Sequence, residues 1–288
     1  MADFELYLNM AGFRWRITTP YALKVEDNYT PFLCAPGEPD CEYAFTIGKP
    51  ELTGTPLIDE DRMTVWRTEH GYRIERLPVL AMKPCACICA QNDDPLHVRG
   101  WIYPGKTGTI QSLTNVFDAG CMEYMLSALG VINLHSAFIR HDGGAILFTA
   151  PSQTGKSTQA GLWEQYCGAE QINGDRSVIR RVDGVWTAFG FPFAGSSGIY
   201  RPDAVPIRAI VVLRQAPENT IERLRPSEAF RLLYSESAIQ RWHEAGHTAV
   251  VDRLLALSRD IPVYLLRCTP DERAVRLLQQ TLSTEETT

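Results

Sequence analysis

Features that mark membrane, secreted and nucleic-acid-binding proteins are missing from this sequence. No apolar run reaches the roughly 18 residues of a transmembrane helix, and the first residues carry neither the basic nor the apolar region of a signal peptide. There is no cluster of Lys and Arg, and the net charge of −6 with a pI near 5.6 disfavours a dedicated nucleic-acid-binding protein. Internal repeats and low-complexity segments are missing as well. We therefore expect a cytoplasmic globular protein that binds neither membranes nor nucleic acids.

The composition is that of an ordinary globular chain. Of the 288 residues, 45% are hydrophobic and 22% are charged, which suits one large domain or two modest ones. The eight cysteines are expected to be reduced thiols, because the nucleotide-binding motif described next is typical of an intracellular protein.

The chain is organised around an apolar run, Gly144–Thr149, and the small-residue loop that follows it and ends in Gly155, Lys156 and Ser157. A phosphate-binding loop needs small residues whose N–H groups surround phosphate oxygens, a lysine that reaches the β- and γ-phosphates, and a hydroxyl that binds Mg²⁺. All three are present, although Ala150 stands where the usual pattern begins with glycine. Residues 158–166 are predicted to form a helix whose N-terminus favours anions. The residues predicted to bind the nucleotide are Ser152, Gln153, Thr154, Gly155, Lys156, Ser157 and Thr158.

Short alternating apolar and polar runs fill the first part of the chain and predict antiparallel strands. Residues 64–77 are predicted to form a hairpin that turns at His70 and Gly71. Around residues 115–132 the apolar residues follow a helical period instead, and Gly130 is predicted to end this helix. The change of period places the predicted domain boundary near residue 112. The runs predicted as strands are 6–10, 13–17, 64–68, 72–77 and 97–103.

The second part of the chain alternates predicted strands and helices. A hairpin is predicted over 180–186, a strand over 207–213, helices from 227 and over 250–258, and a strand over 263–267. Thr269 as N-cap, Pro270 and Glu272 then predict the start of a last helix that ends near residue 282. The predicted fold class is α+β or α/β, with a mostly antiparallel β module over residues 1–112 and a nucleotide-binding α/β domain with a mixed sheet over residues 113–288.

Two further polar residues are predicted to reach the loop. Asp175 follows a short predicted strand, 170–173, and its carboxylate could bind Mg²⁺ or take the proton from an attacking hydroxyl. His135 opens the strand that precedes the loop and could reach the same pocket.

At these residues the chain resembles the HPr serine kinase/phosphorylase family, which shares a nucleotide-binding core with ATP-dependent phosphoenolpyruvate carboxykinase. In that family a His opens the strand before the loop, a Gly-Lys-Ser loop follows, and an Asp-Asp-Arg segment comes next; here these are His135, 155–157 and Gly174-Asp175-Arg176. Gly174 replaces the first Asp of that pair. The resemblance covers about residues 120–282, including the strand-to-helix closure at 261–275, but not the N-terminal module.

The resemblance implies transfer of the γ-phosphate of ATP to a hydroxyl, with ATP and Mg²⁺ as cofactors. It implies that Lys156 holds the phosphates, that Ser157 and Asp175 hold the metal, that Asp175 also orients or deprotonates the acceptor, and that His135 contacts the transferred phosphate. Segment 191–201 lies where the family's substrate-facing loop lies. The residues assigned to the acceptor side are Arg176, Ser196, Ser197 and Arg201.

The preferred acceptor is a Ser or Thr of a peptide or protein, by family analogy. A kinase of the same fold for a small molecule, and a nucleotide-gated binding protein without catalysis, stay open as alternatives, and a homo-oligomer is left open.

Two patterns raise the question of metal. His243-Glu244-Ala-Gly246-His247 matches the H-E-x-x-H signature of zinc peptidases, but Gly246 weakens the required helix and few residues remain to supply a third ligand. Cys85, Cys87 and Cys89 alternate along a predicted strand. A strand face packed with buried thiols is preferred over a metal site there.

Overall fold

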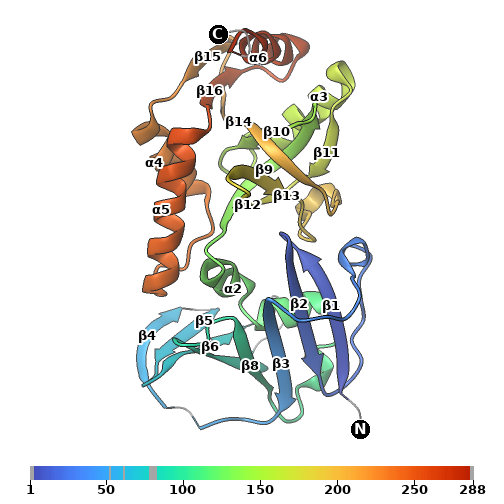
Figure 1. The fold of residues 1–288 in the computed structure, drawn as a ribbon, viewed down its shortest axis with the longest axis vertical. Coiled ribbons are helices and arrows are strands. Elements are labelled where there is room, and N and C mark those ends of the chain that lie inside the picture. Colours follow the sequence, from blue (N-terminus) through green and yellow to red (C-terminus); the bar gives the residue numbers. More distant parts are fainter. Residues whose placement is uncertain (1–2, 52, 61, 78–82, 286–288) are drawn as a thin grey trace. The chain divides into compact units, whose positions relative to one another are not determined.

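The computed structural model describes residues 3–51, 53–60, 62–77 and 83–285, and the chain divides into two compact units (Figure 1). Unit 1 comprises Met1–Leu129 with Gln240–His247, and unit 2 comprises Gly130–Ile239 with Thr248–Thr288. The sequence predicted a boundary near residue 112, whereas unit 1 extends to Leu129 and includes a short segment from the C-terminal half.

Aromatic packing explains why unit 1 extends past residue 112. The ring of Phe117 stacks on Tyr29 with 5.6 Å between centroids, and it meets Trp15 and Tyr43 edge-on at 5.9 and 6.1 Å. All four side chains are buried. The helix that carries Phe117 therefore completes the core of the N-terminal sheet.

Unit 1 is built on one eight-stranded sheet, drawn from blue to teal in Figure 1, with the strand order β1-β2-β3-β8-β7-β6-β5-β4. Its elements in the described residues are β1 (Phe4–Met10), β2 (Phe13–Thr19), η1 (Thr30–Phe32), β3 (Cys41–Ile47), β4 (Thr55–Glu60), β5 (Met63–Arg67), β6 (Gly71–Arg76), β7 (Ala86–Gln91), β8 (His97–Ile102), η2 (Thr107–Thr109), α1 (Leu113–Ala119) and α2 (Met122–Ala128). The predicted β5–β6 hairpin is confirmed, with Thr68 N donating to Gly71 O at 2.9 Å. Most pairings are antiparallel as predicted, but β2–β3 and β3–β8 are parallel.

The single helix predicted from about residue 115 up to Gly130 is wrong, because the structure has two short helices there. Cys121 has a φ of 51°, in the left-handed region, and a residue in that conformation cannot continue a right-handed helix. The chain bends at this residue, α2 begins at Met122, and strand β9 begins at Ile132.

Unit 2 carries the mixed sheet that the sequence predicted. Its elements in the described residues are β9 (Ile132–His141), β10 (Gly144–Thr149), α3 (Lys156–Cys167), β11 (Glu170–Asn173), β12 (Arg176–Val182), β13 (Val185–Phe189), η3 (Gly195–Ser197), β14 (Ala204–Gln215), β15 (Thr220–Arg223), α4 (Pro226–Glu236), α5 (Glu244–Asp260), β16 (Val263–Cys268) and α6 (Glu272–Glu285). The order is β10-β9-β12-β13-β14-β16-β15, with β11 beside β9 and an added β10–β14 pairing. Strand β14 runs parallel to both β10 and β16, and the other pairs are antiparallel.

Helices cover the two faces of this sheet. One core cluster joins the strands to Leu233 of α4 and Leu254 of α5, and the other joins them to Trp163 of α3 and Leu278 of α6. With both faces covered, the loop between β10 and α3 lies at the carboxyl end of a buried strand, where ligands bind in open α/β sheets.

The last helix begins two residues later than predicted, at Glu272 in place of Pro270. Asp271, and not Thr269, caps α6: its Oδ1 accepts from the N–H groups of Arg273 and Ala274 at 3.0 and 3.4 Å. The hydroxyl of Thr269 donates to Asp271 instead, at 2.9 Å. Asp is at least as good an N-cap as Thr, and the helix begins accordingly at Glu272.

Within the described part of the chain, no helix is both long enough and apolar enough to cross a membrane.

Candidate functional site

The predicted strand, loop and helix are present around the Gly-Lys-Ser motif. Strand β10 ends at Thr149 and α3 begins at Lys156, with Gly155 as N-cap at a φ of 114°. Only glycine adopts such a backbone conformation without strain. Helix α3 has no capping side chain and no acidic residue in its first turn, so its N-terminal N–H groups are left for an anion.

Lys156 is buried and folds back over the beginning of the loop. Its Nζ donates to the carbonyl oxygens of Ala150 and Pro151 at 2.8 and 3.3 Å. Burial lowers the pKa of Lys156, and the negative charges of Glu236 and Asp175 oppose this shift. The Lys156 ammonium group is thus held at the start of the loop by two neutral carbonyl oxygens, which a phosphate could replace as acceptors.

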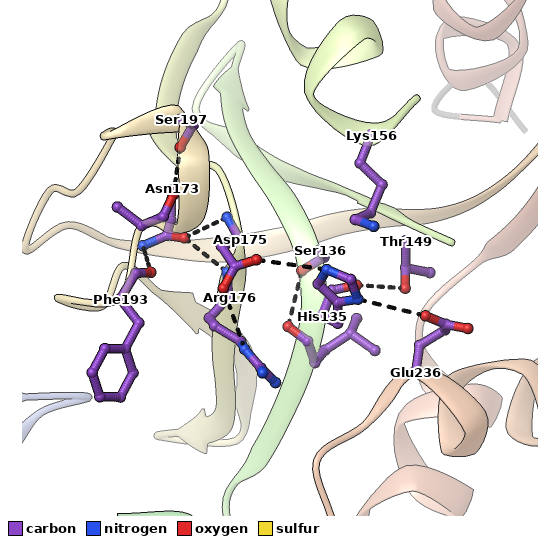
Figure 2. Close-up of polar contacts among 12 residues, drawn as sticks. His135, Ser136, Thr149, Lys156, Asn173, Asp175, Arg176, Phe193, Ser197 and Glu236 are labelled. Atoms are coloured by element: carbon purple, nitrogen blue, oxygen red, sulfur yellow. Dashed lines mark hydrogen bonds and ion pairs between the residues drawn. The ribbon is translucent and has the colours of Figure 1, made fainter. Parts of the chain in front are cut away.

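Asp175 is held in place by the buried side chain of Asn173. The Asn173 Oδ1 accepts from the N–H groups of Asp175 and Arg176, both at 2.8 Å. Its Nδ2 donates to the carbonyl of Phe191 at 2.7 Å and to that of Phe193 at 3.1 Å. Figure 2 shows the contact with Phe193. Sequence reasoning missed Asn173, because the two carbonyls to which its Nδ2 donates become its neighbours only through folding.

His135 and Asp175 face each other across the β9–β12 pair, as the sequence predicted they would approach one pocket. Arg176 pairs with His135 in the ladder, and the His135 Nε2 lies 3.6 Å from Asp175 Oδ1. Asp175 Oδ2 lies 3.5 Å from Arg176 Nε. Burial and the charge of Lys156 lower the pKa of His135, and Asp175 opposes this.

A second carboxylate, which the sequence did not reveal, lies on the other side of the imidazole. Glu236 is the last residue of α4, and its Oε2 is 3.8 Å from His135 Nδ1 (Figure 2). Burial raises the pKa of Glu236, and the charge of Lys156 opposes the shift. A glutamate at the negative C-terminal end of a helix lowers stability. This unfavourable placement was the sequence signal that could have identified Glu236 as a candidate site residue.

A pocket of about 370 Å³ opens beside the loop. Its walls come from the loop, the end of β14 and the end of α4, and it is lined by Ala150, Pro151, Gln153, Thr154, Val212, Leu213, Arg214, Gln215, Leu232, Ser235 and Glu236. Its size and its mixture of apolar walls with a few polar groups are those of small-molecule sites.

The segment predicted to face the acceptor reaches the site only in part. A Cβ on Gly174 would collide with the hydroxyl of Ser197, and a Cβ on Gly195 would lie 2.9 Å from Asp175 Cγ, so residues 195–197 pack against the Asp175 turn. Ser196 is exposed. Arg201 instead faces Glu170, with 3.6 Å between Nη1 and Oε1.

The structure describes the residues of both patterns that raised the question of metal. The described residues contain no group of three or more His, Cys, Asp or Glu that could hold an ion. His243 precedes α5 and is buried against the rings of Tyr72 and Tyr124, at 5.5 and 4.8 Å between centroids. Burial raises the pKa of the thiols of Cys85 and Cys89 to about 11 and also raises that of Cys87, so these groups stay protonated.

The residues at the loop fit a magnesium–nucleotide complex. The uncapped N-terminus of α3 supplies donors for phosphate oxygens, and the exposed hydroxyl of Ser157 and the carboxylate of Asp175 are hard oxygen ligands of the kind Mg²⁺ prefers.

Comparison with known proteins gives one family match. Residues 118–281 match the family described as SynChlorMet cassette protein ScmC. No curated protein matches the chain. Among solved structures, the Hpr(Ser) kinase/phosphatase from Coxiella burnetii is similar at 11% identity and a TM-score of 0.32, over 54% of this chain and 94% of that chain. A similarity this distant does not decide the activity of this chain.

Proposed function

The chain belongs to the ScmC family, and we propose that it is an ATP- and Mg²⁺-dependent kinase that phosphorylates a hydroxyl group. One observation carries the proposal: a Gly-Lys-Ser loop at an uncapped helix N-terminus shares its site with an imidazole that lies 3.6 Å from a carboxylate. The loop offers the means to hold a nucleotide, and the carboxylate offers the means to activate an acceptor.

Each residue has a role that follows from its position. Lys156 turns from the carbonyls of Ala150 and Pro151 to the phosphates, while Ser157 and Asp175 would hold Mg²⁺. When bound, ATP supplies the phosphoryl group and Mg²⁺ offsets its charge. Asp175 accepts the proton of the acceptor hydroxyl, and His135 contacts the phosphoryl group from the side of Lys156. Arg176 lies 3.5 Å from Asp175 and is placed to offset phosphoryl charge.

The preferred acceptor is a Ser or Thr of a peptide or protein. Residues 195–197 pack against Asp175, so an acceptor that reaches this carboxylate must also contact this small-residue segment. The preference for a polypeptide acceptor comes from family analogy. The pocket of about 370 Å³ supports the alternative acceptor, a small molecule, because it ends at Glu236 next to His135.

The test is transfer of label from γ-labelled ATP and Mg²⁺ into a host lysate that is then separated into protein, peptide and small-molecule fractions. The Asp175→Asn protein serves as the blank. Label in protein or peptide that depends on Asp175 supports the preferred acceptor. Asp175-dependent label that appears only in a small molecule other than phosphate supports the alternative. No label in any fraction, with ATP still bound, overturns the kinase proposal in favour of a nucleotide-gated binding protein.

A further inference from the structure

Glu236 occupies a position that costs stability. It ends α4, whose last turn has no basic residue, and its side chain is only 14% exposed. A carboxylate there opposes the negative end of the helix dipole and loses hydration. A charged residue placed where it lowers stability, with no compensating gain, is a candidate for a functional role.

The backbone after α4 fixes Glu236 against strand β9. Ser237 forms an isolated bridge with Leu134, next to His135, and Ala238 N donates to Asn133 O at 2.9 Å. The hydroxyl of Ser237 donates to Leu233 O at 2.7 Å and closes the last turn of the helix. These bonds hold Glu236 beside the imidazole even when the site binds nothing.

The two nitrogens of His135 therefore face different carboxylates, with Glu236 at 3.8 Å from Nδ1 and Asp175 at 3.6 Å from Nε2. Asp175 also approaches Arg176, whereas among the described residues the ion pairs of Glu236 are limited to His135. Asp175 is also more exposed, at 30% against 14% for Glu236. The charge of Lys156 acts on both carboxylates, so what distinguishes Glu236 is its lower exposure and its distance from Arg176. The less solvated carboxylate is the stronger attractor for the single proton of a neutral imidazole.

We infer that Glu236 is the positioning residue of the site: it holds the proton of His135 on Nδ1 and so turns an unprotonated Nε2 toward Asp175 and the reacting groups. This inference rests on the proposed function for its purpose, but the position of the proton does not. The present separation is longer than a hydrogen bond, and such contacts often shorten when substrate binds.

The experiment compares wild type with Glu236→Gln and Glu236→Met. Both substitutions keep the length of the side chain; Gln retains an oxygen that can accept from Nδ1–H, and Met does not. Glu222→Gln is the matched control, because Glu222 is 54% exposed and pairs with Arg267 at 2.8 Å away from the loop. The tautomer of His135 is read from ¹⁵N imidazole shifts at about pH 8, where histidine is ordinarily neutral, both in the nucleotide-free protein and with Mg²⁺-ADP added. The His135→Gln protein assigns the signal.

We expect the Nδ1–H tautomer in wild type, Glu236→Gln and the control, and its loss in Glu236→Met. In the transfer assay, Glu236→Met should lower kcat by roughly 10- to 100-fold, the size of effect that misplacement of a reacting group causes, with KM for ATP within about threefold of wild type. The thermal midpoint of Glu236→Met should not fall, because a carboxylate at the negative end of a helix is removed.

An unchanged tautomer in Glu236→Met overturns the inference, as does a large fall in its thermal midpoint with kcat unchanged, which would make Glu236 a structural residue. A tautomer that depends on Glu236 in a wild-type protein that transfers no phosphate would uphold the positioning role and refute the kinase proposal instead.

Discussion

Replacing Asn173 with Asp tests how the Asp175 turn is held. The substituted carboxylate has the same shape and can still accept from the N–H groups of Asp175 and Arg176, but it cannot donate to the carbonyls of Phe191 and Phe193. Two hydrogen bonds worth about 1 kcal/mol each are lost, and buried acceptors left unsatisfied add to that, so we expect a total cost of about 2–4 kcal/mol.

Hydrogen–deuterium exchange of peptides that cover residues 170–193 measures this cost where it arises. A loss of about 2–4 kcal/mol should speed exchange there by roughly 30- to 1000-fold, since about 1.4 kcal/mol corresponds to tenfold. Asn115→Asp is the matched control: the Asn115 side chain accepts from Gln111 N and Ser112 Oγ, and a carboxylate keeps both bonds. Exchange in Asn173→Asp within threefold of wild type would refute the account of the turn.

Two further predictions concern unit 2. Gly174→Ala should lower the thermal midpoint by about 3–10 °C, because the added Cβ collides with Ser197 and overpacking costs about 1–3 kcal/mol. Adding Ser197→Gly should recover most of this loss. If the effects of the two substitutions simply add, the collision is not the cause. Hydrogen bonds from Arg273 and Thr269 lower the pKa of Asp271 to about 2, from about 3.9 in an unfolded chain. The ionised Asp271 therefore stabilises the folded state above about pH 4, and this stabilisation is lost as the pH falls toward 2. The thermal midpoint of Asp271→Asn should therefore decline less than that of wild type over this range, and an equal decline would show that the cap has no such effect.

Local patterns were sufficient to predict the elements that carry the loop. The apolar run before Ala150, the glycine at 155 and the helical stretch after it act over a few residues, and the structure has this strand, loop and helix. The break at Cys121 was missed because a left-handed residue that is neither Gly nor Asn has no local signature. The parallel pairing of β2, β3 and β8 was missed because pairing partners distant in the chain are set by tertiary packing.

The site was predictable only where its residues lie in or beside the motif. His135, Lys156 and Asp175 come from one stretch of strands and turns, and the structure brings them together. Glu236 and Asn173 act through partners that only the fold supplies: an imidazole on another strand for the first, and two loop carbonyls for the second. Arg201, within the predicted acceptor segment, lies 3.6 Å from Glu170, a contact that the sequence did not predict.

We propose that one site divides two tasks, with Lys156 holding the nucleotide and Asp175 activating the acceptor. The most direct test is calorimetric titration of Mg²⁺-ATP into wild type, Lys156→Ala and Asp175→Asn, in parallel with label transfer by the same three proteins. We expect no measurable binding for Lys156→Ala. For Asp175→Asn we expect binding within about tenfold of wild type and transfer lowered at least 100-fold. Full transfer by Asp175→Asn, or unchanged ATP affinity of Lys156→Ala, would contradict the proposal.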